Sequence, residues 1–259
     1  MTREGITRRV ALRGIVGTGG LILAGCDQLS DNQTFQRMLE SAEKLNLGGQ
    51  RLVLNSSTPL AREYQKSDIS RVFKANGTIR PDGDEYKRMA MEGFQNWKLQ
   101  IGGLVNKPVS YSLEELRAMP SRTQITRHDC VEGWSAIGQW TGVPLSFLLK
   151  QAEMKQNAKY LVFRCADDLI GSRDGSGLYY ESIDMVDAFH PQTIMAYAMN
   201  GQTLPIEHGA PLRLRVERQL GYKMAKYVMR IEAVENFSKI ALGKGGFWED
   251  RGYEWYAGI

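Results

Sequence analysis

The pattern that most constrains the fold is a series of short strand and helix segments without any long strand–helix–strand unit. Apolar and polar residues alternate from Trp97 to Ile101, which predicts a strand, and residues 145–152 predict a short helix after Pro144. The same patterns predict strands at 124–128, 160–165, 193–199, 212–216 and 225–233. Because short strands and short helices interleave, we predict an α+β fold with a mixed β-sheet.

Local sequence signals predict where some of these elements begin and end. Ser112 and Glu115 form a capping box for a short helix that stops at Met119-Pro120. Ser182 is predicted to cap another short helix, which ends before His190. The dipeptide Asn200-Gly201 favours a tight turn between strands.

Residues 1–25 have the form of an export signal. Arg8 and Arg9 precede an uncharged run from 14 to 25, which is too short and too rich in glycine for a membrane span. The arginine pair is typical of the twin-arginine address. Residues 23–26, Leu-Ala-Gly-Cys, resemble the bacterial lipobox, so we predict a lipid anchor at Cys26. The alternative is a buried apolar helix with a chance cysteine.

The segment 26–70 is predicted to be a helix followed by an arm. Asp31 caps a helical pattern whose apolar residues lie on one face, and Gly48-Gly49 is predicted to end it. Residues 50–70 are polar and irregular, so we expect them to wrap around the main domain. That domain is predicted to span residues 71–259.

The charge of the chain gives no support for nucleic-acid binding. The formal net charge is +4, and residues 1–25 account for +3 of it. The remainder is therefore close to neutral, and we predict no nucleic-acid partner.

Cys130 follows an extended segment and is surrounded by charged residues. A thiol in this setting is better placed to be a metal ligand or a nucleophile than to pack in a core. A disulfide with Cys165 is the structural alternative in an exported protein. The absence of any C-x-x-C pair from the sequence argues against a zinc ribbon and against covalent haem.

Four cations near the C-terminal end of the chain form a candidate anion site. Arg213 and Arg215 lie on one face of a predicted strand, because side chains in strands repeat every second residue. Lys223 and Lys226 follow shortly after. Arginine forks and lysine point charges could cradle a phosphate; the alternative is an ordinary solvated strand face.

Several motifs, in one order from about residue 70 to the end, resemble the sulfite oxidase and methionine sulfoxide reductase group of molybdopterin enzymes. They are RHDCVEGW at 127–134, WTGVPL at 140–145, HPQT at 190–193, AYAMNG at 196–201, HGAPLR at 208–213, GYKMAK at 221–226 and GYEWYAGI at 252–259. The resemblance implies a sulfite-oxidase-type molybdopterin-binding fold for residues 71–259 and an oxidoreductase activity.

By this resemblance, Cys130 supplies the protein sulfur to molybdenum, and a soft thiolate suits a redox-active metal. The residues that match cofactor contacts of the family are Asn76, Cys165, His208, Arg213, Met224, Ala225 and Lys226. Cys165 replaces a pterin-contacting threonine of the sulfoxide reductases. No nucleotide motif is present, so the expected cofactor is molybdopterin without a nucleotide.

The residues that match the family's substrate pocket indicate two different substrates. Glu132 and Trp134 resemble the sulfoxide-reductase branch and suit a neutral substrate, with Trp134 shaping the pocket mouth. Tyr197 matches the active-site tyrosine of sulfite oxidases and is predicted to hydrogen-bond near the reacting oxygen. We therefore expect S-oxide reduction, with sulfite oxidation as the alternative.

The resemblance also implies a partner and a location. No haem motif accompanies the cofactor residues, so electrons are expected to come from a separate protein, with a membrane cytochrome b as the natural candidate. The export signal and Cys26 imply a periplasmic enzyme anchored to the inner membrane. Two alternatives of other classes are a non-catalytic lipoprotein that binds an anion or partner, and a thiol redox enzyme using Cys130 and Cys165.

Overall fold

The structure is a computed structural model that describes residues 34, 48–49, 60–172 and 175–259. The chain divides into two compact units, Met1–Pro59 and Leu60–Ile259. The predicted signal at 1–25 and most of the predicted helix from Asp31 lie outside the described residues. Gly48 and Gly49, predicted to end that helix, are themselves helical.

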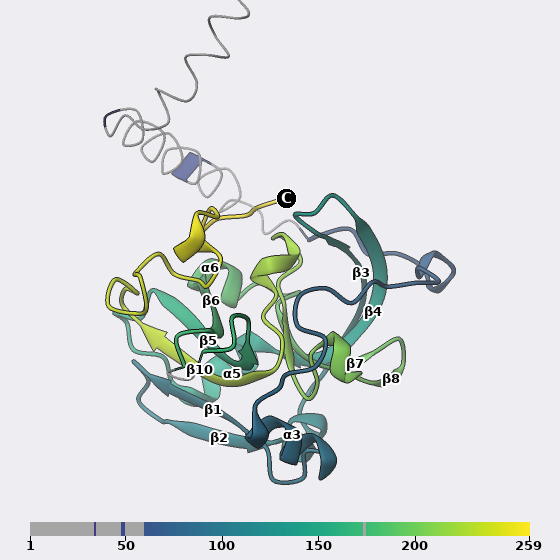
Figure 1. Ribbon diagram of the computed structural model, residues 1–259, viewed down its shortest axis with the longest axis horizontal. Helices are drawn as coiled ribbons and strands as arrows, with labels where there is room; N and C mark the ends of the chain where they lie inside the picture. Colours follow the sequence, from purple (N-terminus) through teal and green to yellow (C-terminus); the bar gives the residue numbers. More distant parts are fainter. Residues whose placement is uncertain (1–33, 35–47, 50–59, 173–174) are drawn as a thin grey trace, which may run out of the picture. The chain divides into compact units, whose positions relative to one another are not determined.

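The second unit contains two five-stranded sheets (Figure 1). The first sheet has the order β2-β1-β10-β5-β6. Its strands are β1 (Lys98–Gly103), β2 (Val109–Ser112), β5 (Tyr160–Asp168), β6 (Leu178–Asp184) and β10 (Val228–Val234). β1 and β10 are parallel, and the other neighbours are antiparallel.

The second sheet is antiparallel and has the order β3-β4-β7-β8, with β9 paired to β7. Its strands are β3 (Arg122–Asp129), β4 (Ser135–Pro144), β7 (Ile194–Met199), β8 (Gln202–Thr203) and β9 (Arg213–Arg215). At the turn between β7 and β8, Asn200 and Gly201 have φ angles of 52° and 78°, which confirms the predicted tight turn.

The helices are short. They are α3 (Asp84–Met91), α4 (Leu113–Ala118), α5 (Leu145–Ala152) and α6 (Met185–Ala188), with 3-10 turns η1 (Lys66–Asp68), η2 (Ile206–His208), η3 (Gly221–Lys223) and η4 (Glu249–Arg251). This arrangement confirms the mixed α+β fold. None of the helices in the described ranges is both long and apolar enough to cross a membrane.

Two predicted helix caps have different outcomes. The capping box of α4 is confirmed, because Glu115 N donates to Ser112 Oγ over 3.1 Å and Ser112 N donates to the Glu115 carboxylate over 2.7 Å. The predicted cap at Ser182 is wrong. Ser182 is buried within β6, and Asp184 caps α6 by accepting a hydrogen bond from Asp187 N over 2.9 Å.

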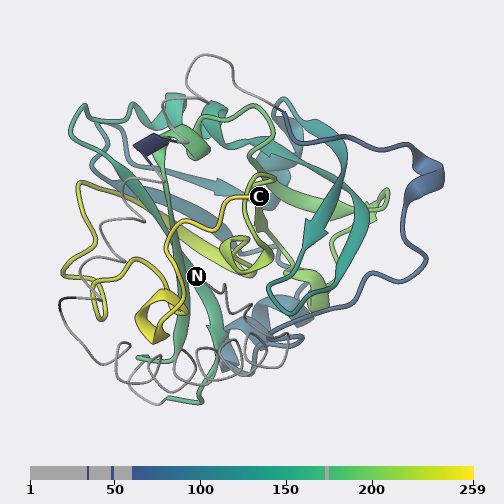
Figure 2. The same cartoon turned by 90° about the horizontal axis from the view of Figure 1, so that it is seen from above.

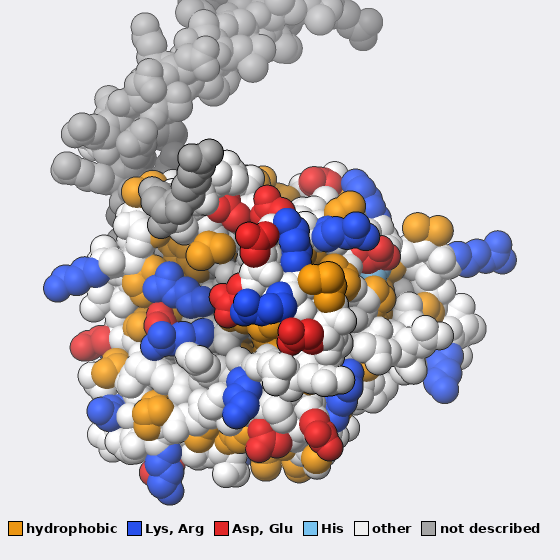
Figure 3. Space-filling model, turned by 60° about the horizontal axis from the view of Figure 1, so that its bottom comes forward, with side chains coloured by type: hydrophobic (Ala, Val, Ile, Leu, Met, Phe, Trp, Pro, Cys, Tyr) orange, Lys and Arg blue, Asp and Glu red, His pale blue; other side chains and the backbone are white. Residues whose placement is uncertain are grey.

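The core is built from the inward faces of both sheets and the apolar sides of the helices. Its large, fully buried aromatic residues in the described part of the chain are Trp97, Trp140, Phe163, Tyr227 and Phe247. On the face drawn in Figure 3, Lys and Arg side chains are interspersed with Asp, Glu and hydrophobic groups.

Residues 60–78 run along the second sheet and lead to the cleft described below (Figures 1 and 2). Tyr64 N donates to Ile125 O over 2.8 Å, and Ser70 N donates to Ile137 O over 3.0 Å. Ala61 N donates to Gln192 Oε1 over 2.7 Å. These bonds fix the segment that positions Phe73, Asn76 and Thr78.

Candidate active site

A cleft of about 240 Å³ opens beside the end of β3, and Cys130 lies in its wall. Cys130 begins a tight turn to β4, in which Cys130 N donates to Trp134 O over 2.9 Å and Gly133 N donates to Cys130 O over 3.0 Å. Gly133 has a φ of +83°, which glycine adopts without a steric penalty. The turn therefore holds the thiol at the strand end while the next residues form the rim.

Cys130 is 9% exposed, and its thiol faces the segment before α3. Asn76 Nδ2 donates to its Sγ over 3.3 Å. Both Cys130 and Cys165 are free thiols, so the disulfide alternative is wrong. The sulfur is thus available as a ligand, and an amide donor orients it.

One wall of the cleft is cationic. Arg213 is buried, and its Nη1 donates to His208 O over 2.9 Å, while its Nε has no hydrogen-bond partner among the described residues. Lys226 Nζ donates to Asn76 O over 2.8 Å and Glu207 O over 3.0 Å. Because Arg213 and Arg215 are both buried, the solvated strand face considered as an alternative is wrong.

These cations repel one another and are poorly hydrated. Burial, and then the charge of Arg213, lower the pKa of Lys226 to about 7 and that of His208 to about 4. Burial and Arg215 lower the pKa of Arg213 to about 9. When the pKa values of neighbouring basic groups are all lowered, too little negative charge lies near them to balance their positive charge. Such an environment suits the binding of an anion.

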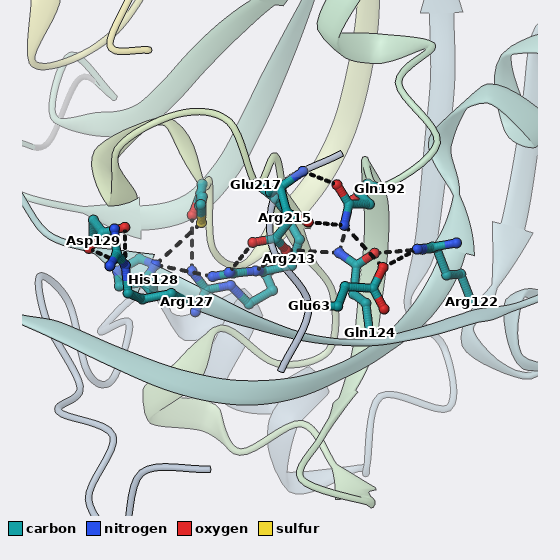
Figure 4. Close-up of polar contacts among 12 residues, drawn as sticks. Glu63, Arg122, Gln124, Arg127, His128, Asp129, Gln192, Arg213, Arg215 and Glu217 are labelled. Atoms are coloured by element: carbon teal, nitrogen blue, oxygen red, sulfur yellow. Dashed lines mark hydrogen bonds and ion pairs between the residues drawn. The ribbon is translucent and has the colours of Figure 1, made fainter. Parts of the chain in front are cut away.

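A buried hydrogen-bond network supports this wall from behind (Figure 4). Arg215 makes a forked ion pair with Glu217, with contacts of 2.9 and 2.6 Å, and Gln124 Nε2 donates to Glu217 over 2.8 Å. Arg215 Nη1 also lies 3.1 Å from His128 Nδ1. Since arginine can only donate, Nδ1 accepts and the ring proton is on Nε2.

His128 lines the cleft as a neutral side chain. Burial, followed by the charges of Arg215 and Arg213, holds the pKa of His128 well below its usual range. The Arg213 and Arg215 guanidinium groups lie 4.9 and 4.4 Å from the centre of the Trp140 ring. Their planes are thereby fixed by packing as well as by hydrogen bonds.

The rim beside Cys130 combines an aromatic ring with a neutralised charge pair. Trp134 Nε1 donates to Glu132 Oε2 over 3.2 Å, and Lys74 Nζ lies 3.4 Å from the same oxygen. The hydrogen bond from Trp134, followed by that from Asn76, lowers the pKa of Glu132. The mouth therefore presents little net charge to a substrate.

Most of the predicted site residues meet in the cleft. Its lining includes Asn76, Cys130, Trp134, His208, Arg213, Met224 and Lys226. Three predicted residues do not line it. Tyr197 packs in the core from β7, Cys165 is buried in β5, and Ala225 bonds through its carbonyl oxygen to Leu214 N over 2.8 Å. The structure therefore does not support a catalytic hydrogen bond from Tyr197 or a cofactor contact by the Cys165 side chain.

The cleft also contains residues that the sequence did not indicate, among them Phe73, Thr78, His128, Asp167, Tyr179, Tyr222, Trp248 and Tyr253. Asp167 is buried, its Oδ1 has no hydrogen-bond partner in the described part of the chain, and burial raises its pKa to about 6. Of these residues, His128, Tyr222 and Tyr253 lay inside quoted motifs, but no role had been assigned to them.

The fold and this cleft define a molybdopterin-binding oxidoreductase. The family model described as "Oxidoreductase molybdopterin binding domain" matches residues 87–240. The chain therefore belongs to this family of molybdenum enzymes.

Particular relatives are named for sulfur-compound redox reactions. The chain is 37% identical to the "Putative protein-methionine-sulfoxide reductase subunit YedZ1" of Azospira oryzae, over 97% of this chain and 87% of the relative. It is 38% identical to the "Protein-methionine-sulfoxide reductase catalytic subunit MsrP" of Xanthomonas axonopodis, over 56% of this chain and 47% of the relative. The sulfane dehydrogenase SoxCD of Paracoccus pantotrophus aligns with a TM-score of 0.48 and 26% identity, covering 55% of this chain and 39% of that one.

The residues of the cleft fit a molybdopterin group. Cys130 offers the soft thiolate that molybdenum accepts. Arg213, Lys226 and His208 would hold a phosphate, and the free Nε of Arg213 is a donor available to it. The unpartnered Oδ1 of Asp167 is an acceptor available to ring N–H groups of a pterin. The buried polar atoms thus match the two polar parts of such a cofactor.

Proposed function

We propose that this protein is the catalytic subunit of an S-oxide reductase, with methionine sulfoxide and related sulfoxides as substrates. The observation that carries the proposal is the position of Cys130, between a buried cationic wall and a nearly neutral aromatic rim. When bound, the cofactor, proposed to be molybdopterin without a nucleotide, supplies two-electron oxygen-atom transfer. The sulfoxide loses its oxygen and takes up two electrons and two protons, so that a thioether and water leave.

The side chains around Cys130 support a neutral substrate over a dianion. Glu132 is paired with Lys74 and Trp134, so the rim offers no unpaired cation to an anionic substrate such as sulfite. The residue that motivated sulfite oxidation, Tyr197, lies in the core. A thioether sulfur, the product of the reaction, packs favourably beside aromatic rings such as Trp134.

We also propose that the enzyme is exported and receives electrons from a membrane haem protein. The first support is the relative from Azospira oryzae, whose name describes it as a reductase subunit. The second is the arginine pair, apolar run and Cys26 in the sequence, which suggest twin-arginine export and a lipid anchor in the periplasm. Release of the protein from membrane fractions by Cys26→Ala is the expected outcome for the anchor, and unchanged membrane association contradicts it.

A direct assay tests the activity. Purified, cofactor-loaded enzyme is supplied with a reduced dye and methionine sulfoxide or dimethyl sulfoxide, and separately with an oxidised dye and sulfite. We expect turnover of the sulfoxides, and turnover of sulfite alone would contradict the proposal. Cys130→Ser should abolish turnover, whereas Cys165→Ala, which removes the other buried free thiol, should retain it.

A further inference from the structure

The C-terminal segment completes the cleft, although the family match ends at Ile240. Trp248 and Tyr253 both line the cleft, one on each side of η4. Their rings stack with centroids 5.3 Å apart and planes at 28°. Tyr222 of η3 meets Tyr253 edge-on at 5.1 Å. Tyr222, Trp248 and Tyr253 thus form one continuous surface, called here the aromatic wall.

The aromatic wall begins beside the turn that carries Cys130. Gly221 precedes Tyr222 and lies so close to the end of β3 that a Cβ there would be 2.4 Å from His128 Nε2 and 3.3 Å from Asp129 O. Asp129 directly precedes Cys130. Tyr253, which contacts both Tyr222 and Trp248, is 39% exposed. The wall therefore lies in the cleft near the turn that carries Cys130 and is partly open to solvent.

Buried contacts hold this wall rigidly. Lys223 Nζ lies 2.5 Å from both Glu181 Oε1 and Glu249 Oε1, and all three side chains are buried. Tyr222 Oη donates to Glu254 O over 2.6 Å. Because ion pairs tie η3 and η4 to β6, the rings occupy fixed positions rather than sampling the surface as loose side chains.

We propose that the aromatic wall determines which S-oxides the enzyme accepts, by packing against the apolar or aromatic substituent on sulfur. This inference rests on the proposed function and specifies its substrate class. Flat aromatic rings favour apolar carbon groups and thioether sulfur, and discriminate against small polar molecules by leaving them without packing partners. Sulfoxides with a large apolar group therefore bind in preference to dimethyl sulfoxide.

Two measurements on the cofactor-loaded enzyme test the role of the wall. Calorimetry gives the Kd of methyl phenyl sulfone and of dimethyl sulfone, and steady-state kinetics gives kcat/KM for the two corresponding sulfoxides. Trp248→Ala and Tyr253→Ala should each weaken binding of the phenyl compound about tenfold and leave the dimethyl compound within about twofold. Tyr253→Phe should restore the preference, because it keeps the ring.

Phe237→Leu is the matched control, since Phe237 follows β10 but packs against Tyr160 and Trp255 outside the cleft. It should retain the wild-type preference. Equal losses for both sulfones in Tyr253→Ala, or no loss for either, would overturn the inference. If the wild type reduces no sulfoxide but the sulfone preference depends on Tyr253, the proposed function fails while the binding role of the wall stands.

Discussion

At the scale of single residues, burying the protonated side chains of the cationic wall lowers the stability of the fold. Burial lowers the pKa values of Lys226, Arg213 and His208, and the neighbouring arginines lower them further, Arg215 for Arg213 and Arg213 for the other two. A fold does not gain stability from such an arrangement, because each protonated side chain is less stable here than in water. An anionic ligand would remove the cost, so we interpret the wall as preformed for phosphate.

The pKa of Lys226 gives a prediction for pH dependence. Its pKa is about 7 in the fold against 10.5 in an ordinary lysine, so the unfolded chain binds more protons between these values. The stability of cofactor-free protein should therefore rise as pH increases from about 7 to 9. Urea unfolding of Lys226→Met should show a smaller rise, whereas the exposed Lys87→Met should match the wild type. Equal slopes in all three proteins would contradict the electrostatic account.

At the scale of elements, the contacts of η3 and η4 with β6 decide the shape of the cleft. Lys223 bridges Glu181 and Glu249, and the pKa of Glu181 is raised well above its usual range by burial and by Glu249. One ammonium group between two buried carboxyl groups cannot be removed without leaving acidic groups unpaired. Lys223 thus links the two turns to the first sheet, together with hydrogen bonds from Tyr179 to Tyr222 O and from Tyr180 to Asp250.

Replacement of this lysine should be severe. We expect Lys223→Met to lower the free energy of unfolding by about 3–5 kcal/mol, as for other buried ion pairs that lose one partner. Lys107→Met removes an ion pair with Glu153 that is exposed, so it should cost at most about 1 kcal/mol. Chemical denaturation of both variants measures the difference. A similar small loss in both would show that the buried cluster does not anchor the turns.

A local signal at the start of α4 allows a second prediction at this scale. Ser112 and Glu115 satisfy each other's backbone N–H groups. Ser112→Ala should destabilise the protein by about 1 kcal/mol, and Ser112→Asp should retain most of the stability because aspartate also caps helices. Thermal unfolding of the two variants compares them directly. An equal loss in both would indicate that the cap contributes little.

At the scale of the whole molecule, the sequence predicted the helices and strands that are determined by residues close to one another in the chain. Alternation located β1, and the capping box located α4. By contrast, β4 contains Gly138 and Gly142, which weaken a strand pattern. Gly142 is needed because a Cβ there would lie 2.1 Å from Met195 O on the neighbouring strand. That requirement comes from a strand distant in sequence, so the sequence pattern alone did not predict β4.

The residues of the candidate site likewise fall into those predicted from a motif and those placed by long-range packing. Cys130, Arg213 and Lys226 belong to contiguous motifs and were predicted from them, and they meet in the cleft. Asp167 and Trp248 lie in none of the quoted motifs, and their places in the cleft come from long-range packing. Tyr197 shows the opposite case, in which a motif predicted a site residue but the strand turns its side chain into the core.

The central claim is that the Cys130 sulfur binds molybdenum within this cleft. Molybdenum X-ray absorption on cofactor-loaded protein tests it most directly, with Cys165→Ala as the control thiol variant. The account predicts one more sulfur neighbour of the metal in the wild type and in Cys165→Ala than in Cys130→Ser. An unchanged sulfur coordination in Cys130→Ser would contradict it.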